Sequence, residues 1–123
     1  MTKKQALIDY LLETMGAMEK ERGRRMSYSD FAEIVDLPLR TVTAMFDPDD
    51  DRLPIRPVAG KVAIGLGSNH ILEILGYELI DETFLRFSRA LRQLPQDQQQ
   101  AIIHQMEAMA KKEVQPANQL VMM

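Results

Sequence analysis

Hydrophobic residues recur at helical spacing along the first part of the chain. The first stripe consists of Leu7, Ile8, Leu11, Leu12, Met15 and Met18. Residues three and four apart share one face of a helix, so this spacing predicts an amphipathic helix over about residues 4–22. Gly23 follows the stripe and is a typical residue for ending a helix.

Two shorter helices are predicted next, on either side of a break at residues 36–38. Ser27 and Asp30 stand at the spacing of a capping box, with Asp in place of the usual Glu or Gln. The buried stripe of this helix is Phe31, Ile34 and Val35. Pro38 ends it, because the residue before a proline avoids the helical region. Pro38 also suits the start of a third helix, which runs to about Phe46.

The sequence after Phe46 predicts a loop, a segment that fits either a helix or a strand, and three further helices. Residues 47–57 contain three prolines and show no periodicity. Residues 58–67 fit either a helical stripe or alternating strand residues, so their spacing leaves both open, including a winged helix with a hairpin at 53–66. Asn69 is expected to cap a helix that ends at Gly76, and Asp81 to cap one over 82–94. A last helix is expected over 96–112.

Length and composition indicate a small protein of one domain with an appendage. We expect domains at 1–76 and 77–113, followed by a flexible tail at 114–123. The 123 residues contain no cysteine, which excludes disulfides, thiolate zinc sites and cysteine nucleophiles. The sequence shows no apolar run of membrane-spanning length and no signal peptide. The expected localisation is therefore cytoplasmic.

Residues 31–45 meet the demands of two helices that cross at a tight turn. An apolar pair four apart, Phe31 and Val35, faces the core, and Ala32 is small enough for a close crossing. Asp36 tolerates the left-handed conformation that the turn needs. Leu37 is expected to fill the space inside the turn. Val42 and Met45 are expected to pack the third helix against the core. A helical hairpin of another kind also meets some of these demands.

The segment from Met26 to Phe46 resembles the lambda-repressor-like helix-turn-helix family, also called the xenobiotic-response-element family. The matching residues are Met26, Ser27, Phe31, Ala32, Val35, Leu37, Thr41, Val42, Thr43 and Met45. The end of the first helix, Lys20–Gly23, also looks like that family's first helix. A weaker likeness to its fourth helix lies in Pro54, Lys61, Ala63, Leu66 and Gly67. The resemblance covers about residues 5–76. It implies an all-α domain of about five helices with a C-terminal helical extension, and a helix rather than a hairpin at 58–67.

The chain departs from the family's pattern at several positions. Tyr28 stands where the family has a glutamine that contacts phosphate, and Pro38 replaces a serine that caps the recognition helix. Asp36 replaces the turn glycine. The loop after the recognition helix is longer by about two residues and acidic, with Asp47, Asp49, Asp50 and Asp51. These changes leave the implied fold intact and weigh against affinity for DNA.

The resemblance implies a sequence-specific regulator of transcription that binds duplex DNA, with residues 38–46 as the recognition helix in the major groove. The implied base contacts are Leu39, Arg40, Thr41, Thr43 and Ala44. Arg40 is the natural reader of guanine through a bidentate contact. The implied phosphate contacts are Arg24, Arg25, Ser27 and Tyr28. The net charge of −3 argues mildly against DNA, whereas the clustering of Lys20, Arg22, Arg24 and Arg25 favours it.

Other functions find less support in the residues. We expect no enzyme, cofactor, small-molecule ligand or metal site, since His70 and His104 lie far apart and no cluster of ligands surrounds them. Asp47, Asp49 and Asp51 do not make a calcium loop, because the glycine and glutamate of such loops are missing. The alternative function is a protein-interaction adaptor, antitoxin-like or anti-repressor, on the same fold.

A homodimer is expected from the apolar stripes of the C-terminal helices. DNA operators usually match the symmetry of protein dimers. The residues expected in the interface are Phe84, Leu85, Leu91, Ile102, Ile103 and Met106. Packing of these helices on their own chain is the alternative.

Overall fold

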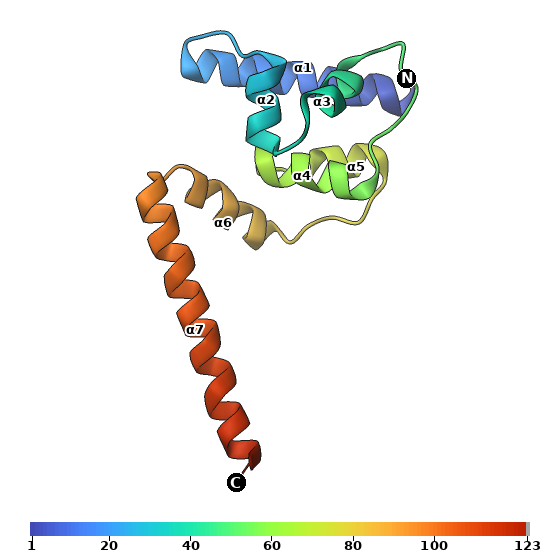
Figure 1. Ribbon diagram of the computed structural model, residues 1–123. Helices are drawn as coiled ribbons and strands as arrows, with labels where there is room; N and C mark the ends of the chain where they lie inside the picture. The colour runs from blue at the N-terminus through green and yellow to red at the C-terminus, as the bar shows by residue number, and fades with distance from the viewer. Residues whose placement is uncertain (123) are drawn as a thin grey trace. The chain divides into compact units, whose positions relative to one another are not determined.

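Hydrophobic stripes at helical spacing become helices throughout the chain (Figure 1). The computed structural model describes the backbone of residues 1–122 and the side chains of residues 1–110. Within this part the helices are α1 Lys3–Arg22, α2 Tyr28–Val35, α3 Leu39–Phe46, α4 Arg56–Leu66, α5 His70–Leu75, α6 Glu82–Arg92 and α7 Gln96–Met122. The prediction of an all-α fold is confirmed, and the alternative of a hairpin at 53–66 is wrong because α4 occupies that stretch.

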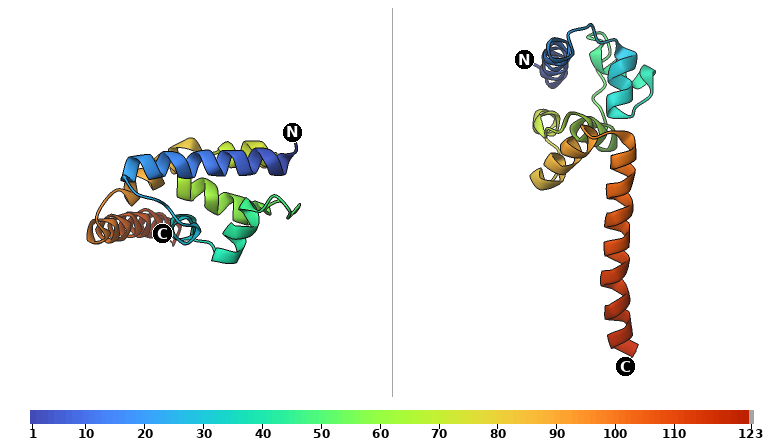
Figure 2. Two further views of the ribbon diagram at one scale, coloured as in Figure 1. Left: turned by 90° about the horizontal axis from the view of Figure 1, so that it is seen from above. Right: turned by 90° about the vertical axis from the view of Figure 1, so that its left-hand side faces the viewer.

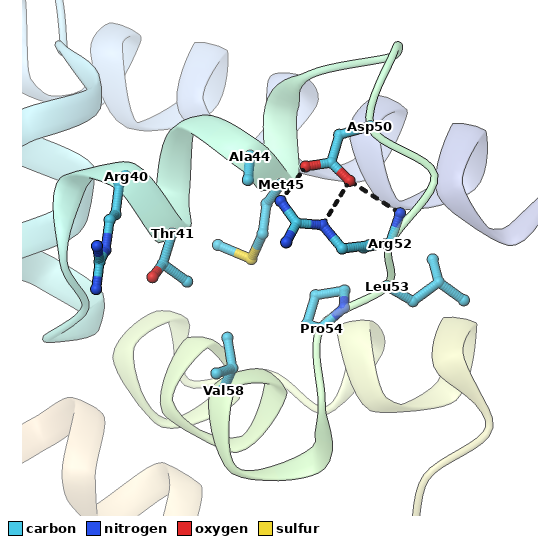
Figure 3. A pocket seen from close by; sticks show the side chains of 9 residues that line it. All are labelled: Arg40, Thr41, Ala44, Met45, Asp50, Arg52, Leu53, Pro54 and Val58. Atoms are coloured by element: carbon cyan, nitrogen blue, oxygen red, sulfur yellow. Dashed lines mark hydrogen bonds and ion pairs between the residues drawn. The ribbon is translucent and has the colours of Figure 1, made fainter.

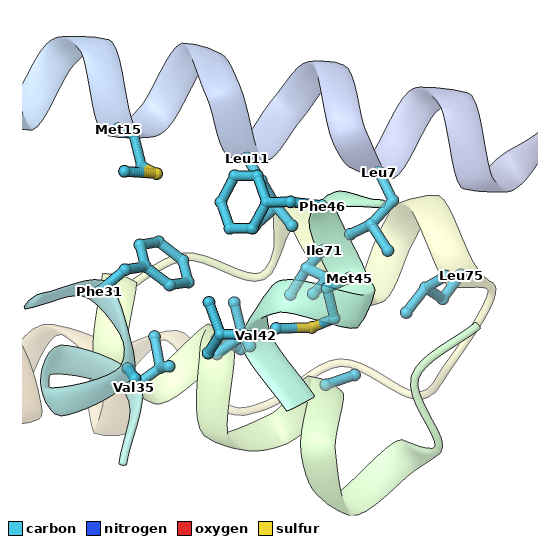
Figure 4. Close-up of a cluster of buried hydrophobic side chains, with 14 of the residues drawn as sticks. Leu7, Leu11, Met15, Phe31, Val35, Val42, Met45, Phe46, Ile71 and Leu75 are labelled. Carbon is cyan, nitrogen blue, oxygen red and sulfur yellow. The ribbon is translucent and has the colours of Figure 1, made fainter. Parts of the chain in front are cut away.

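The first of two compact units comprises residues 1–89. Within it, α1 contacts α3 and α5, α2 packs on α3 and α4, and α4 contacts α5, as Figures 1 and 2 show from three directions. The side chains between these helices form one apolar core (Figure 4). Its fully buried members include Leu7, Leu11, Phe31, Val35, Val42, Val62, Ile71 and Leu72. Helices α1 to α5 therefore share one core, in which α3 packs against α1 and α2.

The ends of α1 and α2 follow the capping signals in the sequence. Gly23 ends α1 in the left-handed conformation, with φ 69°. Ser27 and Asp30 form a complete capping box, in which the Ser27 side chain accepts the Asp30 N–H and the Asp30 carboxylate accepts the Ser27 N–H. Two backbone donors at the start of α2 are thereby satisfied.

Helix α4 forms in the stretch that sequence periodicity left open. Its buried residues are Ala59, Val62 and Ala63, which share one helical face. Gly65 lies directly against α2, where an added Cβ would meet the Ile34 carbonyl oxygen at 2.8 Å. The close approach of α2 and α4 explains why a glycine stands at position 65 inside a helix, which the spacing of hydrophobic residues could not explain.

Asn69 has a different role from the one expected. Its backbone is helical and its side chain makes no cap for α5. Instead, the buried amide accepts the Ile80 N–H at 2.9 Å and donates to the Ile80 carbonyl at 2.7 Å and to the Glu82 carboxylate at 3.0 Å. The Ser68 hydroxyl oxygen accepts the His70 N–H in its place. The prediction that Asn69 caps α5 was therefore wrong: the long-range bonds to residues 80–82 use the whole amide.

Residues 77–89 belong to the first unit, although the expected boundary followed Gly76. The Asn69 amide holds the connection before α6, and Asp81 caps α6 as predicted by accepting the Thr83 and Phe84 N–H groups. Leu85 on α6 is buried, with 1% of its surface exposed, and Arg89 donates to the Gly67 carbonyl at 2.9 Å. Leu85 is thus unavailable to a second copy, which corrects its assignment to a dimer interface.

The second unit runs from Ala90 onward and contains the last turn of α6 and all of α7. The Gln99 side chain donates to the Leu94 carbonyl at 2.8 Å and so satisfies a carbonyl at the end of α6. Helix α7 extends to Met122, beyond the end expected near residue 112. The predicted flexibility of residues 114–123 concerns residues outside those whose side chains are described.

Candidate nucleic-acid interface

A tight turn joins α2 to α3. Asp36 adopts the left-handed conformation, with φ 55° and ψ 52°, as the sequence predicted for the turn. The Leu37 N–H donates to the Ala32 carbonyl at 3.0 Å, and Leu37 packs against the core. Pro38 is extended and its carbonyl accepts the N–H groups of Thr41 and Val42. These bonds fix the direction in which α3 leaves α2.

Helix α3 has a buried face and an open face. Val42, Met45 and Phe46 face the core. Leu39, Arg40 and Thr43 are exposed, and Leu39 leaves 48% of its surface free. The guanidinium of Arg40 has no hydrogen bond or ion pair among the described side chains. The Thr43 hydroxyl donates to the Leu39 carbonyl at 2.9 Å, so its proton is already used within α3.

The other two residues expected to contact bases lie on the flank of α3. Thr41 and Ala44 are half-buried and line a pocket of about 430 Å³ (Figure 3). Arg40 lines the same pocket, so it belongs both to the open face of α3 and to the pocket wall.

Residues at the start of α2 stand next to α3. Tyr28 stacks on Phe46 with 4.6 Å between ring centroids and 23° between ring planes, and it is 39% exposed. Ser27 is exposed but its oxygen already caps α2. Arg24 and Arg25 are exposed in the connection between α1 and α2. All four expected phosphate contacts are thus accessible, and Tyr28 is held beside α3 by stacking.

The charges around α3 differ between its two ends. Arg40 lies in the first turn of the helix, and near the turn that precedes it Lys61 pairs with Asp36 at 3.6 Å. The last turn leads into Asp47, Asp49 and Asp51, which are exposed. The acidic groups of the loop therefore lie at the carboxyl end of α3.

The acidic loop contains an ordered ion pair that sequence analysis did not identify. Arg52 binds Asp50 in a bidentate manner, with Nη2 to Oδ2 at 2.7 Å and Nε to Oδ1 at 3.0 Å. Hydrogen bonds from the Arg52 side chain and backbone N–H hold the pKa of Asp50 well below its usual range. Asp50 is thus neutralised by its neighbour, whereas the other aspartates of the loop have no such partner among the described residues.

Side chains of Lys4 and Tyr77 hold the same loop against the core. Lys4 is 8% exposed, and its ammonium donates to the Ala44 carbonyl at 2.8 Å and to the Arg52 carbonyl at 3.3 Å. The Tyr77 hydroxyl donates to the Pro54 carbonyl at 2.8 Å. Sequence analysis missed both residues, although Lys4 stands three positions before Leu7 and so shares the buried stripe of α1.

Among the described residues, no three His, Asp or Glu side chains are grouped so as to hold a metal ion. The same part of the chain has no helix with the length and apolar character to cross a membrane. Comparisons with protein-family models, curated proteins and solved structures found no match to the chain.

Proposed function

We propose that this chain is a lambda-repressor-like helix-turn-helix protein, a non-enzymatic regulator of transcription that binds duplex DNA in a sequence-specific manner. One observation carries the proposal. Helix α3 is fixed to the core by Val42, Met45 and Phe46, while its opposite face, with Leu39, Arg40 and Thr43, is open. The major groove of DNA is about 12 Å wide and accommodates a helix presented in this way.

In the proposed complex the amino end of α3 enters the groove. Residues at the start of a recognition helix reach base edges. Arg40 is free to make a bidentate contact with guanine, and the Thr43 methyl group suits the methyl group of thymine. The exposed residues Arg24, Arg25, Ser27 and Tyr28 contact phosphates of the DNA backbone in this proposal. This orientation keeps the carboxylates after α3 at the far end of the helix from the bases.

Replacement of Arg40 tests the assignment. We expect Arg40→Ala to weaken binding to a preferred sequence by about 1–3 kcal/mol and to relax the preference at one base pair. Arg86→Ala is the matched control, because Arg86 is also exposed in the first unit but lies on α6. Both variants lose one positive charge. Equal losses of affinity in the two variants, with the base preference unchanged, would refute the role of Arg40.

A second candidate function is a protein-interaction adaptor, antitoxin-like or anti-repressor, on the same fold. The exposed carboxylates of Asp47, Asp49 and Asp51 favour it, because they repel phosphate. Salt dependence separates the two functions. A DNA-binding protein loses affinity steeply between low and moderate salt as counterions are released. An adaptor has no affinity for DNA to lose under either condition.

We also propose that the regulator acts in the cytoplasm as a homodimer. The support is the apolar surface that remains open in the C-terminal part: Phe84 is 49% and Met106 48% exposed. Leu91, Ile102 and Ile103 are half-buried. Sedimentation at micromolar concentration tests the dimer, and a monomeric mass would exclude it.

A further inference from the structure

The pocket beside α3 is large enough to hold a small molecule. Its volume of about 430 Å³ lies within the range of known ligand pockets, roughly 300–1,000 Å³. Figure 3 shows α3 on one side, the loop with Asp50 and Arg52 on another, and Val58 of α4 below. The pocket is formed within the first unit, so a second copy of the chain is not needed to complete it.

Irregular backbone forms one wall of this pocket, and side chains from distant parts of the first unit hold it in place. Lys4 of α1 binds the Arg52 carbonyl as well as the Ala44 carbonyl of α3, and Tyr77, which follows α5, binds the Pro54 carbonyl. The Arg52 side chain is itself held by both oxygens of Asp50. A wall anchored at Arg52 and Pro54 is already ordered before a ligand arrives, which lowers the entropic cost of binding.

The lining of the pocket defines the chemistry of its ligand. Met45 and Pro54 are buried and, with Val58, give an apolar interior. Arg52 and Asp50 neutralise each other, whereas the Arg40 guanidinium is unpaired among the described side chains. The lining therefore carries one uncompensated positive charge next to an apolar surface. Guanidinium groups bind carboxylates through paired hydrogen bonds.

From this arrangement we infer that the pocket binds a small monocarboxylate with a compact apolar body. The carboxylate pairs with Arg40, and the apolar body occupies the space between Met45 and Val58. Because Arg40 lines the pocket and is also the proposed contact to guanine, a carboxylate that pairs with Arg40 withdraws it from DNA. This regulatory consequence rests on the proposed function, whereas binding of the carboxylate does not.

The direct test is a titration of the full chain, labelled with ¹³C in its methionine methyl groups, with sodium hexanoate at constant ionic strength. The uncharged control is hexanamide, which has a similar shape. We expect the Met45 methyl signal to shift with a dissociation constant on the order of 1 mM, as for ligands of few atoms, and about tenfold weaker binding of the amide. The signals of Met106 and Met109 on α7 should not move. An unmoved Met45 signal, or equal binding of acid and amide, would overturn the inference.

Two variants locate the bound ligand. Val58→Phe fills the pocket and should abolish the hexanoate shift. Arg40→Gln replaces an exposed side chain, which does not disturb the core, and should make acid and amide bind equally. Wild-type binding of hexanoate to Arg40→Gln would exclude the proposed pairing.

A second experiment tests whether the bound carboxylate competes with DNA. If DNA binds, saturating hexanoate should weaken it several-fold in the wild type and leave Val58→Phe unaffected. DNA binding that does not respond to hexanoate refutes the competition. An absence of DNA binding refutes the proposed function and leaves the carboxylate titration to stand by itself.

Discussion

The contact between α2 and α4 makes a quantitative prediction about Gly65. A Cβ at this position would lie 2.8 Å from the Ile34 carbonyl oxygen and 2.9 Å from the Val35 Cα. Both are backbone atoms, so α2 must move as a unit to accept even one methyl group. Crowding of this kind costs about 1–3 kcal/mol. Alanine also favours the helix over glycine by about 1 kcal/mol, which offsets part of the cost.

Gly60 on the same helix provides the matched control. An added Cβ at Gly60 meets no atom within 4 Å. Gly60→Ala should therefore stabilise the protein by about 1 kcal/mol through helix propensity alone. Gly65→Ala should destabilise it by about 1 kcal/mol, which leaves a difference of about 2 kcal/mol that isolates the contact with α2. Propensity cancels in this difference because both positions lie inside α4.

Urea denaturation, monitored by circular dichroism, measures the free energy of unfolding of both variants and of the wild type. For a unit of this size, 1 kcal/mol corresponds to a change in Tm of about 4–8 °C, so thermal unfolding gives an independent reading. If Gly65→Ala proved as stable as Gly60→Ala, the close packing of α2 on α4 would be refuted. The orientation of α3 would then also be in question, because α2 fixes it through the turn.

Three further substitutions probe the turn, the connection to α6 and the cap of α2. Asp36→Gly should raise the free energy of unfolding by up to about 1 kcal/mol, because glycine adopts the left-handed conformation of this turn without cost. The ion pair with Lys61 that is lost is exposed and therefore weak. A destabilised variant would contradict this expectation. Asn69→Ala should lower stability by about 2 kcal/mol and increase amide exchange over residues 77–89, since one buried amide makes three hydrogen bonds; unchanged exchange there would exclude the tether. Hydrogen bonds with the backbone N–H and the side chain of Ser27 hold the pKa of Asp30 below its usual range. The stabilisation by the Asp30 carboxylate is therefore present above about pH 4 and lost as the pH falls through the lowered pKa, so Asp30→Asn should be less stable than wild type near neutral pH and should approach it in acid; a pH-independent difference would argue against the charge.

The parts of the fold that depend on local sequence could be predicted. The Ser27–Asp30 box, the left-handed turn at Asp36 and the helix end at Gly23 each involve residues within a few positions of one another. Such signals depend on backbone geometry that neighbouring residues determine. The open face of α3 also followed from spacing, because burying Val42 and Met45 leaves Arg40 and Thr43 on the other side.

The features that the sequence did not reveal depend on contacts between distant residues. Lys4 and Ala44 are forty positions apart, and Tyr77 reaches Pro54 across twenty-three. The Asn69 side chain could have capped α5 locally. Instead it hydrogen-bonds both the N–H and the carbonyl of Ile80, eleven positions away. Periodicity shows on which face of a helix a residue lies, but it does not show which distant residue that face contacts. The pocket beside α3 and the extension of the first unit to residue 89 therefore became visible only in the structure.

Selection of the purified full chain on a random pool of duplex DNA shows whether the protein recognises a particular DNA sequence. We expect enrichment of one recurring sequence motif, bound with an affinity that falls steeply between low and moderate salt. We also expect Arg40→Ala to lose the preference at one position of that motif while Arg86→Ala retains it. A pool that remains unenriched after repeated rounds at low salt would rule out sequence-specific binding of duplex DNA by this protein.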